Sequence, residues 1–113
     1  MQIISFEDFI KLEIRIGKIL SAERIEGSDK LLKLIVDFGG TSDVPQTRQV
    51  IAGIGKIYAP EALIGKECPF AYNLAPRMLK GLESQGMILC PSDNGSPVLL
   101  HPDKEVPPGS LIK

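Results

Sequence analysis

The side chains that could do chemistry concentrate between Asn73 and Met87. The run from Asn73 to Gly81 (Asn-Leu-Ala-Pro-Arg-Met-Leu-Lys-Gly) combines two cations with a rigid proline and a turn glycine. Arg77 can hold a phosphate through two parallel hydrogen bonds, whereas Lys80 acts as a point charge. Asn73 offers both a donor and an acceptor to a base edge or a ribose hydroxyl. This combination predicts a loop that grips a polyanion rather than one that reacts with a substrate.

The segment Ser84-Gln85-Gly86-Met87, which begins three residues after Gly81, could extend the same contact. Ser84 and Gln85 can hydrogen-bond to RNA, and Gly86 permits close approach of the backbone. A methionine that opens an apolar strand is more often part of a core, but the thioether of Met87 could also pack on a base. An ordinary polar loop that covers one end of the fold is the alternative for the whole region.

A third cluster of cations consists of Lys30, Lys33 and Arg48. Lys33 alternates with Leu32 and Leu34 in a strand-like pattern, so its side chain should face solvent. The net charge of −1 argues against nonspecific nucleic-acid binding by bulk charge, although cations outnumber acids between Arg48 and Gly81. The chain has no Trp and few other aromatic residues on which single-stranded bases could stack. These features favour recognition of a folded RNA by its backbone and shape.

Catalytic and metal sites find little support. The only histidine, His101, is typical of a solvent-side residue and has no nucleophile motif near it. Cys68 and Cys90 show no metal-ligand spacing and lie in apolar runs, which is typical of buried free thiols in a reducing cytosol. The segment Gly53-Ile54-Gly55-Lys56 lacks the Ser or Thr of a phosphate loop. We therefore expect a non-catalytic protein that needs no metal and no cofactor.

The elements that must position these residues are short strands. The chain has 113 residues, of which 43% are hydrophobic, with eleven Gly and nine Pro. We expect one domain over residues 1–113, with about 91–113 as a C-terminal extension. Strands are expected over residues 13–23, 32–38, 47–52, 67–72 and 85–90, with a short helix after Ser5 and a helical turn at Pro60. Gly17, in the middle of the first strand, predicts the bend that lets one strand serve both sides of a closed barrel. Five strands with a helix between the third and fourth predict an all-β OB-fold barrel, although another small barrel would also fit.

Several spaced blocks resemble the tRNA-binding domain family. The main block is the run from Asn73 to Met87; the others are residues 12–19, 28–32, 36–39 and 48–54, in the order of the family. The resemblance implies an OB-fold that recognises tRNA by shape at the outer corner of the L, without catalysis. It implies that Ser84 and Met87 lie at the tRNA surface and that Arg77 and Lys80 are the basic loop positions. A Lys usual in the family loop is replaced here by Ala75.

The resemblance also implies partners. Free-standing members of the family are homodimers, and other members follow methionyl-tRNA synthetase or serve as its beta subunit. Because the chain begins at Met1 and stops soon after Pro107-Pro108-Gly109, we expect a free-standing protein or such a subunit. The apolar residues 98–100 and 111–112 could form a dimer surface or pack over the barrel end. No signal segment or membrane-length run is visible, so a cytoplasmic location is expected. A chaperone-like dimer that binds extended peptides is the alternative, although chaperone relatives lack the Pro76-Arg77 and Ser84 to Met87 pattern.

Overall fold

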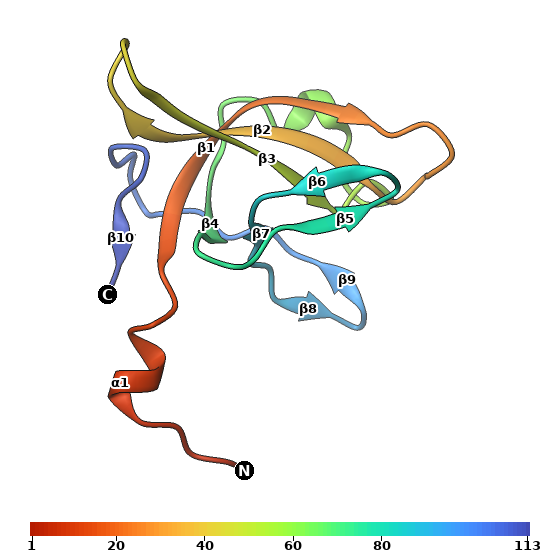
Figure 1. Ribbon diagram of the computed structural model, residues 1–113. Coiled ribbons are helices and arrows are strands. Elements are labelled where there is room, and N and C mark those ends of the chain that lie inside the picture. The colour runs from red at the N-terminus through yellow and green to blue at the C-terminus, as the bar shows by residue number, and fades with distance from the viewer.

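A computed structural model describes residues 1–113. The fold is nearly all-β, as the sequence predicts, with one short helix and one 3-10 turn (Figure 1). The elements are α1 (Phe6–Phe9), β1 (Ile14–Arg24), β2 (Leu32–Gly40), β3 (Pro45–Ala52), η1 (Pro60–Ala62), β4 (Glu67–Ala71), β5 (Arg77–Leu79), β6 (Leu82–Ser84), β7 (Met87–Ile88), β8 (Ser92–Asp93), β9 (Ser96–Pro97) and β10 (Leu111–Ile112).

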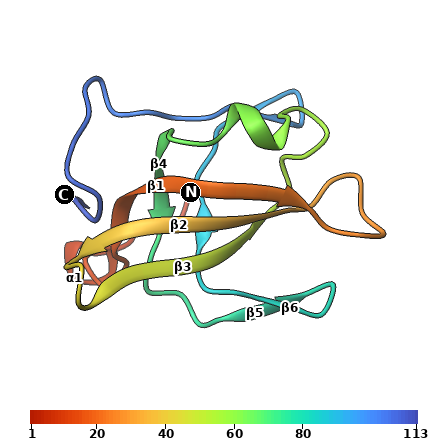
Figure 2. The same ribbon diagram turned by 90° about the horizontal axis from the view of Figure 1, so that it is seen from above.

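The main sheet has the strand order β3-β2-β1-β4-β7. The sheet curls because β1 bends and pairs with β4 along one half and with β2 along the other (Figure 2). The first half of β1 pairs with β4 and the second half with β2, and Lys18 belongs to both ladders. Gly17 lies at this bend. A Cβ atom there would lie 2.4 Å from Cγ1 of Val36 and 2.8 Å from Cε1 of Phe38. Glycine is therefore required by the close crossing of β1 over β2, which confirms the expected bend of the curled OB-like sheet.

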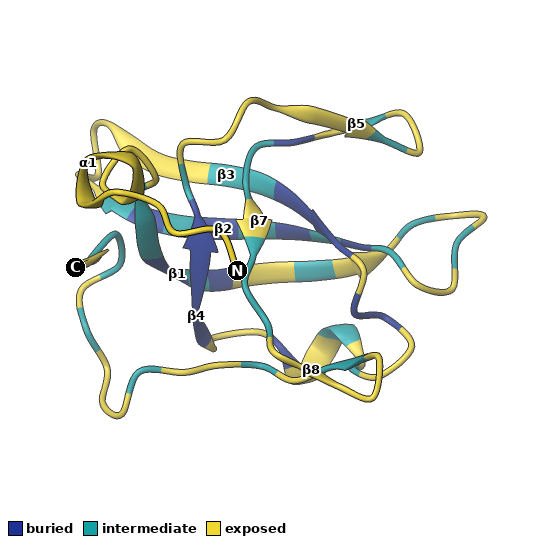
Figure 3. Ribbon diagram, turned by 90° about the horizontal axis from the view of Figure 1, so that it is seen from below, coloured by how far each residue is buried: buried dark blue, intermediate teal, exposed yellow.

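The core follows the alternation of β2. Leu32, Leu34, Val36 and Phe38 are buried, and the residues between them are half-buried. All of β4 is buried (Figure 3). The C-terminal segment contacts the first residue of this strand, because His101 and Val106 both hydrogen-bond to Glu67. Phe70 in β4 meets Phe38 edge to face, with ring centroids 5.4 Å apart. The expected third and fourth strands are confirmed to within two residues, and a 3-10 turn begins at Pro60.

Two details of the predicted elements were wrong. The run from Asn73 to Gly81 is not a simple loop, because its second half forms a β-hairpin with residues 82–84. The expected fifth strand over residues 85–90 shortens to Met87–Ile88. The reason is that Gln85 donates its backbone N–H to the carbonyl of Gln49 in β3 at 2.8 Å, so it joins the other side of the barrel.

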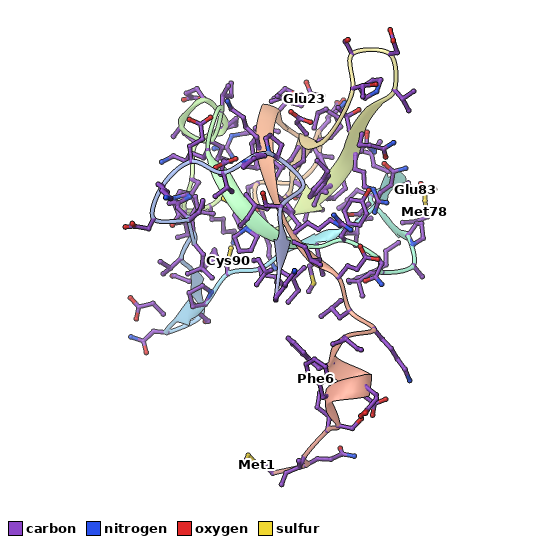
Figure 4. All side chains as sticks on the ribbon, turned by 90° about the vertical axis from the view of Figure 1, so that its left-hand side faces the viewer. Met1, Phe6, Glu23, Met78, Glu83 and Cys90 are labelled. Atoms are coloured by element: carbon purple, nitrogen blue, oxygen red, sulfur yellow. The ribbon has the colours of Figure 1, made fainter.

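The first and last elements of the chain, α1 and β10, lie near each other at one side of the barrel. Ser5 caps α1 by accepting a hydrogen bond from the amide of Asp8 at 3.1 Å, as expected. The helix leads away from the barrel and buries none of its residues (Figures 1 and 4). The C-terminal strand β10 pairs with the start of β1, with Ile112 opposite Ile14. None of the helices is long and apolar enough to span a membrane.

Candidate RNA interface

The β5–β6 hairpin carries the two cations of the predicted loop. Its turn consists of Lys80 and Gly81, both in the left-handed region with φ of 51° and 78°. Two consecutive residues with positive φ make the type I′ turn that matches the twist of a hairpin. Leu79 lies opposite Leu82 across this turn, and Arg77 lies opposite Ser84. The side chains of Arg77 and Lys80 are therefore carried by a paired two-stranded arm and not by an irregular loop.

Ser84 and Gln85 fasten this arm to the edge of β3. The hydroxyl of Ser84 accepts a hydrogen bond from the amide of Ile51 at 2.9 Å and donates one to the carbonyl of Gly86 at 2.9 Å. The side-chain oxygen of Gln85 accepts from the amide of Gln49 at 3.0 Å. These contacts satisfy groups along the edge strand β3 and close the barrel between β3 and β7. Ser84 is buried, with 4% of its surface exposed.

Arg48 and Asn73 also bind parts of their own chain. The guanidinium of Arg48 lies 3.5 Å from the centre of the Tyr72 ring and donates to the carbonyls of Tyr72 and Gln85. Asn73 accepts from the amide of Glu13 at 2.7 Å and donates to the carbonyl of Lys11 at 2.6 Å. Both side chains hold strand ends in place and leave part of their polar groups at the surface.

The structure gathers six of the predicted residues around two adjacent hollows. One, of about 560 Å³, is lined by Arg48, Tyr72, Asn73, Leu74, Ala75, Pro76 and Gln85. The other, of about 80 Å³, is lined by Ile51, Leu74, Ala75, Arg77, Leu79, Ser84, Gly86 and Met87. Leu74 and Ala75 belong to both and form the ridge between them. Residues from β3, the β4–β5 connection and the β5–β6 arm thus meet on one surface.

Lys30, Lys33 and Lys80 lie outside these hollows. Lys33 is half-buried on β2, and its ammonium group pairs with the carboxylate of Glu23 at 2.6 Å. Lys30 ends the β1–β2 loop, where its carbonyl accepts from the amide of Gly55 at 2.7 Å. The β1–β2 loop and the turn of the β5–β6 arm extend toward the same end of the barrel (Figures 1 and 2). Lys30 and Lys80 could therefore flank one ligand, whereas Lys33 is already neutralised.

The charges at this end are free to meet an anion. Arg77, Lys80 and Lys30 take part in none of the five ion pairs of the chain. Arg77 and Lys80 are exposed and donate no hydrogen bond through their side chains to the protein. An arginine without an internal partner can meet phosphate without first breaking a contact. No group of three or more His, Cys, Asp or Glu residues gathers to hold a metal ion.

Sequence patterns missed two residues of this surface, Gln49 and Tyr72, and one on the other face of the arm, Met78. Gln49 matters because its amide, carbonyl and side chain all bind the segment 83–85. Tyr72 supplies the ring under Arg48. Met78 lies on the outer face of the arm opposite Glu83, where 64% of its surface is exposed (Figure 4). Only the alternation within the β5–β6 hairpin could have placed Met78, and that hairpin was not expected.

A family model and a curated relative both connect this chain with tRNA. A family model described as a putative tRNA binding domain matches residues 14–111. The chain is 50% identical over 111 residues to the methionine–tRNA ligase of Methanothrix thermoacetophila. That match covers 98% of this chain and 16% of the ligase, so the chain spans only a small part of this relative.

Two solved structures are similar over their whole length. A MetRS related protein from Pyrococcus horikoshii is 35% identical, with a TM-score of 0.90, and the match covers 100% of both chains. The chaperone CsaA from Bacillus anthracis is 34% identical, with a TM-score of 0.86, and the match covers 99% of this chain and 100% of that one. Proteins with two different described roles thus share this fold.

Proposed function

This chain belongs to the family of putative tRNA-binding domains, and on that premise we propose that it binds tRNA in the cytoplasm as a non-catalytic module. The observation that carries the proposal is the pair of exposed, unpaired cations Arg77 and Lys80 on a two-stranded arm. They stand beside hollows lined by polar groups of Arg48, Asn73 and Gln85. Cations that meet phosphate, next to polar groups that meet ribose or base edges, are what RNA recognition requires.

The proposed target within tRNA is the outer corner of the L. The β5–β6 arm and the β1–β2 loop both project from the same end of the barrel (Figure 2). These two segments correspond to the loops through which OB-folds bind oligonucleotides. Two such segments suit a folded RNA surface better than a flexible single strand, and the chain has no Trp for base stacking. We therefore propose that shape and phosphate positions select the ligand, with little sequence preference.

A titration tests this proposal directly. The full chain is titrated with whole tRNA and with an acceptor minihelix that lacks the corner, each at two salt concentrations. Tight, salt-sensitive binding to tRNA and weak binding to the minihelix are expected. Equal binding to both would contradict corner recognition, and no binding to either would contradict the RNA function.

We also propose that the chain forms a homodimer through its N- and C-terminal elements. Phe6 in α1 is 70% exposed and Ile10, which caps the helix, is 55% exposed, while the neighbouring β10 exposes 45% of Leu111 and 42% of Ile112. The same elements line a hollow of about 320 Å³, together with Phe9 and other residues. A continuous apolar surface of this kind is characteristic of an interface. A second copy would cover it by a two-fold arrangement.

A methionyl-tRNA synthetase catalytic chain is a further proposed partner, because the chain is 50% identical to one part of a methionine–tRNA ligase. Co-purification of the two chains mixed in equal amounts tests this association. A complex that survives gel filtration is expected, and separate elution at micromolar concentration would contradict it.

Peptide binding is the second candidate function, supported by the similarity to the chaperone CsaA. A chaperone role predicts that the chain suppresses aggregation of an unfolded test protein in the absence of RNA. It also predicts that tRNA does not compete. Suppression that survives Arg77→Ala would favour this second function, whereas tRNA binding lost in Arg77→Ala favours the first.

A further inference from the structure

Cys68 in β4 and Cys90, two residues after β7, occupy facing positions when the ladder between these two strands is continued. β4 pairs with β7 in antiparallel register, with Phe70 opposite Ile88. Continuing the register by two residues along each chain places Cys68 opposite Cys90. Although they are separated by more than twenty positions in sequence, the fold makes them cross-strand neighbours.

The hydrogen bonds of this ladder fix how close the two residues come. The amide of Leu89 donates to the carbonyl of Pro69 at 3.0 Å, which makes these two a hydrogen-bonded pair. Cys68 and Cys90 are therefore the adjacent non-hydrogen-bonded pair. In such pairs the Cα atoms are about 4.5 Å apart and the side chains approach each other closely. A disulfide needs a Cα separation of about 4.4–6.8 Å, and the spacing typical of a non-hydrogen-bonded pair falls within this range.

The two thiols also share a face and differ in access. Cys68 is fully buried in the core cluster that contains Phe70, and Ile88 packs against that cluster from the opposite strand. Because alternate residues of a strand share a face, Cys90 points to the same side as Ile88. Both thiols are free, and Cys90 is only half-buried. Cys90 lies on the body of the barrel, away from α1 (Figure 4).

We propose that Cys68 and Cys90 form a redox-sensitive dithiol site, which low-molecular-weight disulfides oxidise to an intramolecular cross-strand disulfide. The accessible Cys90 thiolate attacks one sulfur of the oxidant, which breaks the S–S bond and releases one thiolate. The thiolate of Cys68 then attacks the Cys90 sulfur of the mixed disulfide and displaces the second thiolate. Two protein thiols are oxidised, one small disulfide is reduced to two thiols, and a reducing thiol reverses the reaction.

The surroundings of Cys68 make the second step slow at neutral pH. Burial, the neighbouring Cys90 and the carboxylate of Glu67 raise the pKa of the Cys68 thiol to about 11, against the opposing effect of Lys66. Nδ1 of His101 lies 3.7 Å from the sulfur and 2.7 Å from the carbonyl of Glu67. Since a carbonyl only accepts, Nδ1 carries a proton and cannot take one from the thiol. Closure of the bond should therefore accelerate about tenfold per pH unit between pH 7 and 9.

The bond would close a loop over residues 69–89, which contains the whole β5–β6 arm. Closing a loop of this size restricts the unfolded chain and stabilises the fold. We expect the oxidised form to melt about 5–15 °C above the reduced form. The two-residue strand β7 would gain a covalent link to β4.

The test equilibrates the full chain with graded ratios of reduced to oxidised glutathione, followed by acid quench, mass spectrometry and a non-reducing peptide map. We expect loss of two thiols without retained glutathione, one Cys68–Cys90 peptide and the rise in Tm. Cys90→Ser should keep a free Cys68 thiol, and its Tm should not respond to the oxidant; Cys90→Ala provides the same check with a non-polar residue. Persistent thiols in oxidised buffer, a stable glutathione adduct on Cys90, or a bond between two chains would each overturn the proposal.

Discussion

The hydroxyl of Ser84 and the amide of Ile51 are joined by a buried hydrogen bond of 2.9 Å. Ser84 was expected at an RNA surface, yet both hydrogen-bonding capacities of its hydroxyl serve the protein. The consequence is that Ser84 positions the β5–β6 arm, and Arg77 opposite it, relative to β3. Changes at Ser84 should therefore act first on stability and only through the arm on RNA binding.

Ser84→Ala should lower the free energy of unfolding by about 1–3 kcal/mol, because the amide of Ile51 would be buried without a partner. Urea unfolding followed by circular dichroism measures this loss. Ser21→Ala is the matched control, since Ser21 is exposed on β1 and its side chain makes no hydrogen bond. Equal stability of the two variants would show that the Ser84 bond contributes nothing.

Arg77→Ala should weaken tRNA binding by about 1–2 kcal/mol and reduce the salt slope by about one, because a phosphate contact is lost. The tRNA affinity of Arg77→Lys should lie between those of the unchanged protein and Arg77→Ala, since lysine keeps the charge but loses the paired hydrogen bonds. The measurement is a fluorescence titration at several salt concentrations. Lys104→Ala, which removes an exposed cation from the C-terminal segment, controls for net charge. The arm would have to be removed from the proposed interface if both alanine variants bound alike.

Gly17→Ala should destabilise the fold by about 1–3 kcal/mol. The new methyl group would overlap the buried side chains of Val36 and Phe38, which cannot move away. Thermal unfolding checks this. In Gly53→Ala the new methyl would meet only the flexible end of Lys30 at 2.9 Å, so that variant should change stability by much less.

Phe6→Glu and Phe9→Glu should separate the proposed dimer into monomers, because each places a charge in the apolar surface around α1. Analytical ultracentrifugation over a range of concentrations reads out the mass. The monomeric variants should still fold, since α1 buries none of its residues in the chain, and their Tm should fall only by the lost stabilisation from association. Val44→Glu, at an exposed apolar position of the β2–β3 turn, is the control and should stay dimeric.

The stability of the reduced protein should fall as pH rises through the range from about 9 to 11. Burial is the main cause that raises the pKa of Cys68 to about 11, so the folded state keeps this proton where the unfolded chain loses it. The Cys68 thiol contributes fully to the free energy of unfolding below its pKa in the unfolded chain. This contribution, about 2 kcal/mol in total, is lost as the pH rises through the pKa of Cys68 in the folded protein. Urea unfolding in reducing buffer across this range, compared with Cys68→Ala, isolates it. Parallel pH profiles of the two proteins would contradict this assignment.

The sequence by itself determined the features that depend on local order. The alternation of apolar residues in β2 predicts its buried face, because neighbouring side chains of a strand point to opposite sides. Ser5 and Pro60 each predict the start of a helix. Ser5 acts by capping and Pro60 by its fixed φ, and both effects act within one helical turn. Gly17 predicted the bend of β1, since only a residue without a side chain permits β1 to cross β2 so closely.

Only the tertiary structure decided how the polar side chains are used. Lys33 was expected to face solvent as one of three cations, and β1 brings Glu23 beside it. Ser84 and Gln85 are predicted to meet RNA, and the structure adds that both bind amides at the edge of β3. These outcomes depend on pairing between strands far apart in the chain, where register is set by the whole barrel and not by neighbouring residues.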